Sequence, residues 1–181
     1  MPVAFRGILE EHQHTRRVCS IFDICHMGKF EFRGETAASD LARLLSAPVA
    51  TLLPGRGAYG YLLNEQARPL DDVIVFCRAP AHYWLVVNSS RKQPDAAWIQ
   101  PRLSPSTMFA DVDGLFGKLD IQGPKARECL EKALGARLPD LRYFQIAEAG
   151  LLGEDCVISR TGYTGEFGYE LYPPLAACER F

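Results

Sequence analysis

Apolar residues along the chain recur with the period of a helix in some blocks and alternate with polar residues in others. In 29–34, Phe30 and Phe32 alternate with charged residues, which is the pattern of a half-buried strand. In 124–134, a proline lies in the first turn and Gly135 follows the last, as is typical of a helix with a C-terminal cap. The same reasoning predicts helices at 8–18, 39–46 (ended by Pro48), 95–100 and from 175 onward, and strands at 59–63, 70–77, 83–88, 115–122, 154–160 and 167–172.

These short helices and strands alternate and are joined by hairpin-like links. The sequence contains no glycine-rich dinucleotide-binding motif and no P-loop. We therefore expect an α+β fold with antiparallel sheets and packed helices rather than a parallel sheet of the Rossmann type. A chain of 181 residues is long enough for one sizeable hydrophobic core or two small ones.

Composition narrows the class of protein. The net charge is −2, with 20 Lys and Arg against 22 Asp and Glu and no basic run, so nucleic acid is not the expected main partner. The strongest apolar run, Val73–Cys77, is too short to cross a membrane, and the N-terminus has no signal-peptide core. Six cysteines without CxxC pairing indicate buried thiols in a reducing compartment, which predicts a cytoplasmic protein.

The adjacent residues Cys25 and His26 suggest a metal ligand pair or a nucleophile. No second Cys/His pair lies nearby in the sequence, and a structural role for both residues is therefore the favoured interpretation. We predict no metal site.

A glycine-rich loop at 161–166 leads into the aromatic strand 167–172. Along that strand Glu170 points away from the face that carries Tyr169. A carboxylate at a strand end beside aromatic rings suits a flat, nitrogen-rich heterocycle, because it accepts two adjacent N–H bonds while Tyr163 packs on the ring. The alternative is a solvent-exposed glutamate on a hairpin.

Asp71 and Asp72 come directly before the apolar run 73–76. Adjacent strand residues face opposite ways, so the two carboxylates cannot act as one dyad, but at least one of them lies at the mouth of a buried layer. Such a carboxylate orients an amine or accepts its proton. The alternative is an aspartate that caps a turn. Tyr59 and Asn88 fall at neighbouring strand ends, where a pocket often forms, although each also fits a rim or turn position.

Six ordered motifs resemble those of the aminomethyltransferase family, the T-protein of the glycine cleavage system. They are DICHMG at 23–28, YGYLLNE at 59–65, LDDVIV at 70–75, LVVN at 85–88, LDIQGP at 119–124 and SRTGYTGE at 159–166. The resemblance implies two small ferredoxin-like-type layers of the T-protein folate-binding fold. It also implies transfer of a methylene unit from the aminomethyl-lipoyl H-protein to tetrahydrofolate, with release of ammonia, in glycine catabolism and one-carbon metabolism.

The resemblance also implies roles for individual residues. Asp72 matches the essential aspartate near the folate nitrogens, with Asp71 as the alternative, and Glu170 matches the carboxylate that holds the pterin ring. Tyr59, Asn88 and Tyr163 match residues that line the pocket. Tetrahydrofolate is then the co-substrate, and the lipoylated H-protein is the partner.

The sequence departs from the family in length and in detail. We expect residues 1–181 to be a truncated folate-binding region, in which a subdomain at roughly 35–110 is inserted between 1–34 and 111–181. The C-terminal half of the family, with its β-barrel domain, is missing, so catalysis is expected to be incomplete in this chain. Cys25 stands where a serine is usual. Two alternatives are the folate domain of a dimethylglycine- or sarcosine-oxidising enzyme and a non-catalytic folate-binding module.

Overall fold

The computed structural model describes residues 4–181, and the first three residues of the N-terminal segment discussed above lie outside this range. The chain forms two compact units. Unit 1 contains the segment up to Ile24 together with Gly117–Tyr143 and Ala147–Phe181, and unit 2 contains Cys25–Phe116 with Phe144–Ile146. No helix of the described residues is long and apolar enough to cross a membrane.

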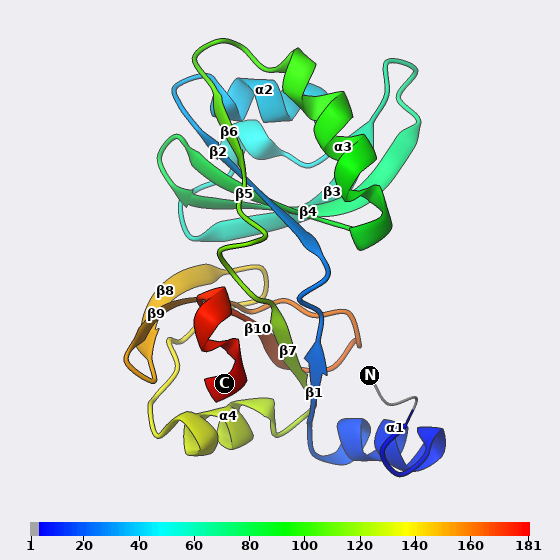
Figure 1. Cartoon of the computed structure of the whole chain (residues 1–181), viewed down its shortest axis with the longest axis vertical. Coiled ribbons are helices and arrows are strands. Elements are labelled where there is room, and N and C mark those ends of the chain that lie inside the picture. Colours follow the sequence, from blue (N-terminus) through cyan, green and yellow to red (C-terminus); the bar gives the residue numbers. More distant parts are fainter. Residues whose placement is uncertain (1–3) are drawn as a thin grey trace. The chain divides into compact units, whose positions relative to one another are not determined.

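Unit 1 is built on a sheet with the strand order β1-β7-β10-β9-β8 (Figure 1). Its strands are β1 (Ser20–Asp23), β7 (Leu119–Gln122), β8 (Ile146–Leu151), β9 (Glu154–Ser159) and β10 (Gly168–Tyr172). Strand β7 pairs antiparallel with both β1 and β10, and β10 pairs antiparallel with β9. Every residue of β7 and β10 is buried, so the centre of this sheet is covered on both faces.

Three helical segments belong to unit 1. They are α1 (Ile8–Arg17), α4 (Ala126–Leu134) and the 3-10 helix η4 (Leu175–Arg180). Helix α4 buries Ala126, Leu130 and Leu134, which recur every four residues on one side of the helix. Gly135 closes α4 in the left-handed conformation, with φ of 61°, which confirms the cap predicted from the sequence.

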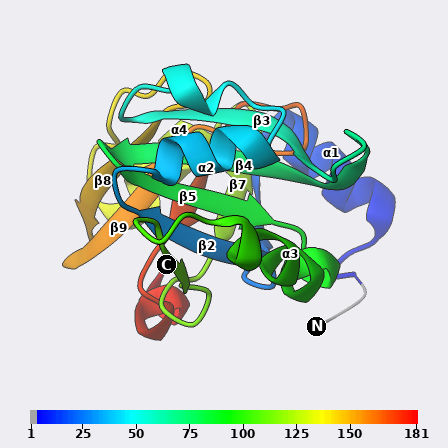
Figure 2. The ribbon, with the colours of Figure 1, turned by 90° about the horizontal axis from the view of Figure 1, so that it is seen from above.

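Unit 2 contains a second antiparallel sheet, with the strand order β3-β4-β5-β2-β6. Its strands are β2 (Gly28–Arg33), β3 (Arg56–Leu63), β4 (Pro69–Ala79), β5 (His82–Val87) and β6 (Met108–Asp111), and its α-helices are α2 (Ala37–Leu44) and α3 (Lys92–Ile99). Figure 2 shows both helices over one face of this sheet. Phe30, Leu41, Val75, Leu85 and Ile99 are fully buried there and bring the sheet and both helices into one core.

The structure confirms the antiparallel α+β class and corrects several boundaries. Strand β2 pairs with β5 and β6, so residues 28–34 belong to unit 2, although the sequence placed the edge of a subdomain near residue 35. Helix α2 ends at Leu44 rather than at the predicted Ser46, because Leu45 is extended and bridges to Leu62. The helix predicted from 175 onward is a 3-10 helix, Leu175–Arg180. Helix α3 starts at Lys92 rather than at the predicted residue 95. Strands β1, β6 and β8 were not predicted, and β7 is shorter than the predicted 115–122.

Candidate functional site

Asp71 and Asp72 begin the long strand β4, close to its hairpin with β3. In the β3–β4 ladder Asp71 is opposite Leu62 and Asp72 is opposite Tyr61, and the register shifts just beyond this point. The Asp71 side chain points into the core side and is 8% exposed, whereas Asp72 is exposed to solvent. The carboxylate at the mouth of the buried layer is therefore Asp71, and the one open to a ligand is Asp72.

Asn88 joins the two carboxylates. Its backbone N–H donates to Asp71 Oδ2 at 3.0 Å, and its side-chain Nδ2 donates to Asp71 Oδ1 and to Asp72 Oδ1, each at 2.9 Å. The sequence reasoning kept the two aspartates apart because they face opposite sides of the strand. The structure shows that a single amide at the end of the next strand, β5, reaches both. Asn88 also accepts a turn hydrogen bond from the Arg91 N–H, so its turn role and its site role coexist.

Tyr59 lies on the same side of β3 as Tyr61, and the two rings meet edge to face at 5.7 Å between centroids. Its hydroxyl lies 3.4 Å from Asp72 Oδ2. A hydrogen bond with Tyr61, and then burial and the charge of Asp72, raise the pKa of Tyr59 to about 12. The Tyr59 hydroxyl therefore stays protonated at neutral pH and faces a carboxylate oxygen that accepts no other hydrogen bond from residues 4–181.

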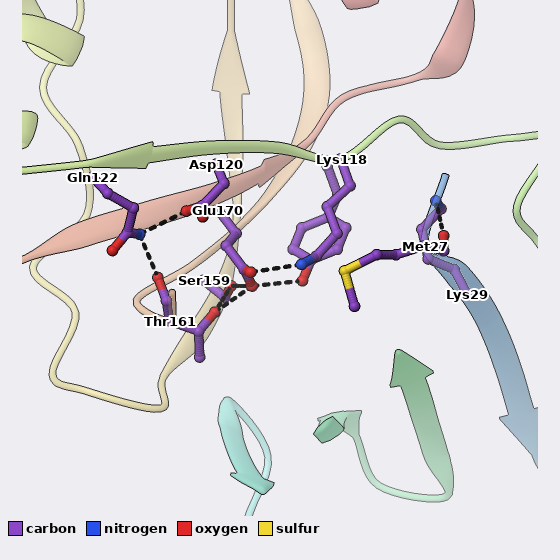
Figure 3. Close-up of polar contacts among 9 residues, drawn as sticks. Met27, Lys29, Lys118, Asp120, Gln122, Ser159, Thr161 and Glu170 are labelled. Carbon is purple, nitrogen blue, oxygen red and sulfur yellow. Dashed lines mark hydrogen bonds and ion pairs between the residues drawn. The ribbon is translucent and has the colours of Figure 1, made fainter. Parts of the chain in front are cut away.

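Glu170 lies at the centre of the unit 1 sheet. On β10 it is opposite Asp120 of β7 on one side and opposite Ser159 of β9 on the other. The residue is 3% exposed. Lys118 Nζ lies 2.5 Å from Glu170 Oε1 in a buried ion pair (Figure 3), and it lies 5.8 Å from the centroid of the Tyr172 ring.

Hydroxyl groups hold the second oxygen of Glu170. Oε2 accepts hydrogen bonds from Thr161 at 2.5 Å, from Tyr172 at 3.1 Å and from Ser159 at 3.4 Å. A buried carboxylate with a cation on one oxygen and hydroxyl donors on the other is fixed in place. Burial and then the charge of Glu170 raise the pKa of Tyr172 well above its ordinary value.

Asp120 and Gln122 extend this buried polar cluster to the glycine-rich loop. Burial first, and then the charge of Glu170, raise the pKa of Asp120 to about 7. Gln122 Nε2 donates to Asp120 Oδ1 at 2.6 Å and to the Thr161 carbonyl oxygen at 3.1 Å. A Cβ atom added to Gly162 would lie 2.1 Å from Gln122 Nε2, so a side chain at that position would displace the Gln122 amide from its hydrogen bonds.

The loop that carries Tyr163 is anchored on its other side by α1. Arg16 donates to the Thr164 carbonyl oxygen and to Glu166 Oε1, both at 2.8 Å. The side chain of Tyr163 is 96% exposed, so its ring faces are available to a ligand. Tyr163 therefore projects from a loop whose backbone is held in place.

The structure brings together three of the five site residues that the sequence predicted: Tyr59, Asp72 and Asn88. Glu170 lies in its own buried cluster in unit 1, and Tyr163 lies on the loop before it. Sequence reasoning missed Lys118 and Asp120 as partners of Glu170. The signal available was the alternation of Lys118, Asp120 and Gln122 with Leu119 and Ile121, which identifies a strand but does not say that its polar face is buried.

Three relatives are similar to almost the whole chain. The aminomethyltransferase of Desulforamulus reducens is 36% identical over 99% of this chain and 50% of the relative, and that of Synechococcus elongatus is 36% identical over 98% and 49%. The crystal structure of glycine cleavage system aminomethyltransferase T from Bartonella henselae superposes with a TM-score of 0.87 at 33% identity, covering 99% of this chain and 50% of that one. This chain thus spans about half the length of these relatives.

The fold also occurs in another enzyme. A chain of the heterotetrameric sarcosine oxidase from Corynebacterium sp. U-96 superposes with a TM-score of 0.65 at 16% identity, which is a likeness of fold alone. The family assignment rests on a separate match, because residues 1–180 match the GCVT N-terminal domain. The chain therefore belongs to the GCVT N-terminal domain family.

Proposed function

We propose that this chain provides the tetrahydrofolate-binding residues of an aminomethyltransferase of the glycine cleavage system. The reaction moves the methylene unit of the aminomethyl-lipoyl group of the H-protein to tetrahydrofolate and releases ammonia. The observation that carries this proposal is the Asp72 carboxylate, which is exposed but held through Oδ1 by Asn88 and faced at Oδ2 by Tyr59. The relatives named above, at 33–36% identity, support the same activity.

Asp72 suits the reacting end of the folate. One of its oxygens is fixed by the Asn88 amide, and the other, which faces the Tyr59 hydroxyl, keeps an acceptor position among residues 4–181. A carboxylate fixed in this way can accept an N–H bond from an amine without first reorganising. It also stabilises the positive charge that develops on nitrogen as ammonia leaves.

Glu170 suits the pterin ring. Its Oε2 accepts from the hydroxyl groups of Thr161 and Tyr172 as its two nearest donors, whereas Oε1 accepts only the Lys118 ammonium group among the bonds described above. A carboxylate oxygen can accept two hydrogen bonds, so Oε1 keeps one acceptor position for a pterin N–H. The exposed ring of Tyr163 offers a face on which a flat heterocycle stacks.

Two features support the remaining expectations. All six cysteines are free thiols, and this supports a reducing, cytoplasmic setting. The lipoylated H-protein is the expected partner because the reaction draws its one-carbon unit from the lipoyl arm. The folate domain of a sarcosine-type oxidising enzyme shares the fold, but its 16% identity gives it weaker support than the aminomethyltransferases have.

The experiment that tests this function supplies aminomethyl-lipoyl H-protein and tetrahydrofolate to the chain joined to the C-terminal half of the Desulforamulus reducens aminomethyltransferase, and measures ammonia and methylenetetrahydrofolate. We expect product to require both substrates. We expect Asp72→Asn to lower the rate by about 100-fold or more, the usual cost of losing a charge aimed at the transition state. The matched control is Asp140→Asn, since the Asp140 side chain is 98% exposed. Equal rates for the two variants would contradict the role of Asp72.

A further inference from the structure

Asp95 is a fully buried carboxyl group close to the Asp72 site. It lies on α3, and Ile99, one turn further along, is buried on the same side of the helix. Asp95 Oδ1 is 3.4 Å from a guanidinium nitrogen of Arg91. Asp95 Oδ2 has no hydrogen-bond donor among residues 4–181. A buried carboxylate oxygen without a donor is costly as an anion, and this favours the protonated form.

The group that faces Asp95 across this buried space is Asp71 on β4. The two carboxyl groups are within hydrogen-bonding reach of each other. Asp71 already accepts two hydrogen bonds from Asn88, one from the backbone N–H and one from Nδ2. Two carboxyl groups placed this closely avoid mutual repulsion when they share one proton.

A count of donors and acceptors shows where that proton belongs. Asn88 supplies all the donors that the structure gives to Asp71, while Asp95 Oδ2 lacks any donor. A protonated Asp95 that donates a hydrogen bond to Asp71 gives both carboxyl groups a hydrogen-bond partner. Of the described residues, no three His, Cys, Asp or Glu side chains are placed to hold a metal ion, so a shared proton accounts for the cluster better than a shared cation.

We propose that Asp95 is a positioning residue, which donates a hydrogen bond to Asp71 and so holds the Asn88 amide against Asp72. The chain of contacts runs from the buried acid on α3, through Asp71 on β4, to the amide after β5 and then to the exposed carboxylate. Its importance for catalysis rests on the function proposed for Asp72. The hydrogen-bond chain itself does not depend on that function.

The charges around Asp95 set the pH at which this arrangement changes. Burial first, and then the hydrogen bond with Asp71 and its negative charge, raise the pKa of Asp95 to about 7, and the Arg91 guanidinium opposes this shift. Above that pH Asp95 carries a negative charge beside the buried Asp71 carboxyl group. Asp71 then repels Asp95. Because Asn88 donates two hydrogen bonds to Asp71, the chemical environment of the Asn88 amide changes as well.

Asparagine is a convenient reporter, because the sequence contains only Asn64 and Asn88. Asn64 lies in the β3–β4 hairpin, where its Oδ1 accepts from Gln66 and Arg68, and it serves as an internal control. The experiment follows the side-chain NH₂ signals of ¹⁵N-asparagine in the whole chain by NMR from pH 5 to pH 9. We expect the Asn88 signals to shift with a midpoint near 7, and the Asn64 signals to show no such transition.

Variants separate positioning from a merely structural role. Asp95→Asn keeps a donor toward Asp71 at every pH, so it should abolish the Asn88 transition and keep the signals near their low-pH positions. Asp95→Ala lacks the donor and should give Asn88 signals that match neither end of the wild-type titration. Asp120→Asn removes the other acid with a pKa near 7, in unit 1, and should leave the Asn88 transition in place.

The outcomes decide the proposal without any folate. An Asn88 transition that persists in Asp95→Asn, or wild-type Asn88 signals that do not change between pH 5 and pH 9, would overturn it. If Asp95→Asn does not fold, the ¹³Cγ signal of Asp95 in the wild-type chain gives the same answer, because a midpoint near 4 excludes the shared proton. Failure of tetrahydrofolate to bind would count against the proposed function alone.

Discussion

Lys118 Nζ and Glu170 Oε1 lie 2.5 Å apart, and both side chains are almost fully shielded from solvent. The two residues are 52 positions apart in the sequence and meet because β7 and β10 pair directly. Glu170, the carboxylate proposed to hold the pterin ring, therefore has its own internal cation. Without that cation, a buried anion would remain beside the raised-pKa acid Asp120.

Removing the Lys118 ammonium group should destabilise unit 1 strongly. Lys118→Met keeps most of the side-chain volume but leaves Glu170 without a counter-ion, and breaking one partner of a buried ion pair costs about 3–5 kcal/mol of unfolding free energy. Urea denaturation followed by circular dichroism measures this loss. The control is Arg6→Met, which removes the cation of the exposed Arg6–Glu10 pair and should cost about 1 kcal/mol or less. Equal losses in the two variants would mean that the Lys118–Glu170 pair does not stabilise the sheet.

Gly168 is predicted to be intolerant of a side chain. An added Cβ atom would lie 2.4 Å from the Ile121 carbonyl oxygen and 2.3 Å from Gln122 Nε2, and both belong to the neighbouring strand. Because the backbone cannot move away without breaking the β7–β10 ladder, Gly168→Ala should destabilise the chain by about 1–3 kcal/mol. Gly150→Ala, on β8, has open space at the added Cβ and should change stability by only about 0.5 kcal/mol. Thermal unfolding of the two variants tests this difference, and a Gly168→Ala chain as stable as wild type would contradict the close approach.

The contributions of Asp95 and Asp120 to stability should fall as the pH rises from about 4 to 7, whereas His82, whose pKa is lowered by burial, contributes with the opposite sign. The pKa values of Asp95 and Asp120 are raised from 3.8 to about 7, so across this window both acids hold protons in the folded state that the unfolded chain has lost. Their contribution is fully present below pH 3.8 and is lost as the pH passes 7, with a slope of up to about 1.4 kcal/mol per pH unit for each group.

Urea denaturation at several pH values between 5 and 7.5 measures that slope. Asp95→Asn and Asp120→Asn each replace one titrating group with a neutral side chain, so each should make the slope more positive than in wild type. The double variant should show the sum of the two changes, because the residues belong to different units. A slope that neither substitution alters would show that both carboxyl groups are ionised in the folded protein at pH 5.

Local patterns predicted the elements well where one residue type fixes the geometry. The cap of α4 at Gly135 is an example, since only a left-handed residue closes the helix in that way. The pattern could not assign β2 to its sheet, because alternation reports the period of a strand and not its partner. Nor could it show that Lys118 and Asp120 are buried, since their neighbours come from β10, far along the chain.

The same limit applied to the candidate site. Asp72 and Asn88 were found because each ends or begins an apolar strand, and polar residues at neighbouring strand ends tend to meet. Asp95 was missed, because a single aspartate in the first turn of a short helix is ordinary in sequence. Its importance depends on burial against Asp71, which only the packing of α3 on the sheet creates.

The central claim is that Glu170 and Asp72 bind tetrahydrofolate, and calorimetric titration of this chain with tetrahydrofolate under reducing conditions tests it most directly. We predict saturable binding by the wild-type chain and binding at least about tenfold weaker in Glu170→Gln and Asp72→Asn, because each loses a charged hydrogen bond worth roughly 1.5–3 kcal/mol. Asp140→Asn, which changes an exposed carboxylate, should bind like wild type. A folded wild-type chain that produces no binding heat, or a Glu170→Gln variant that binds as tightly as wild type, would contradict the claim.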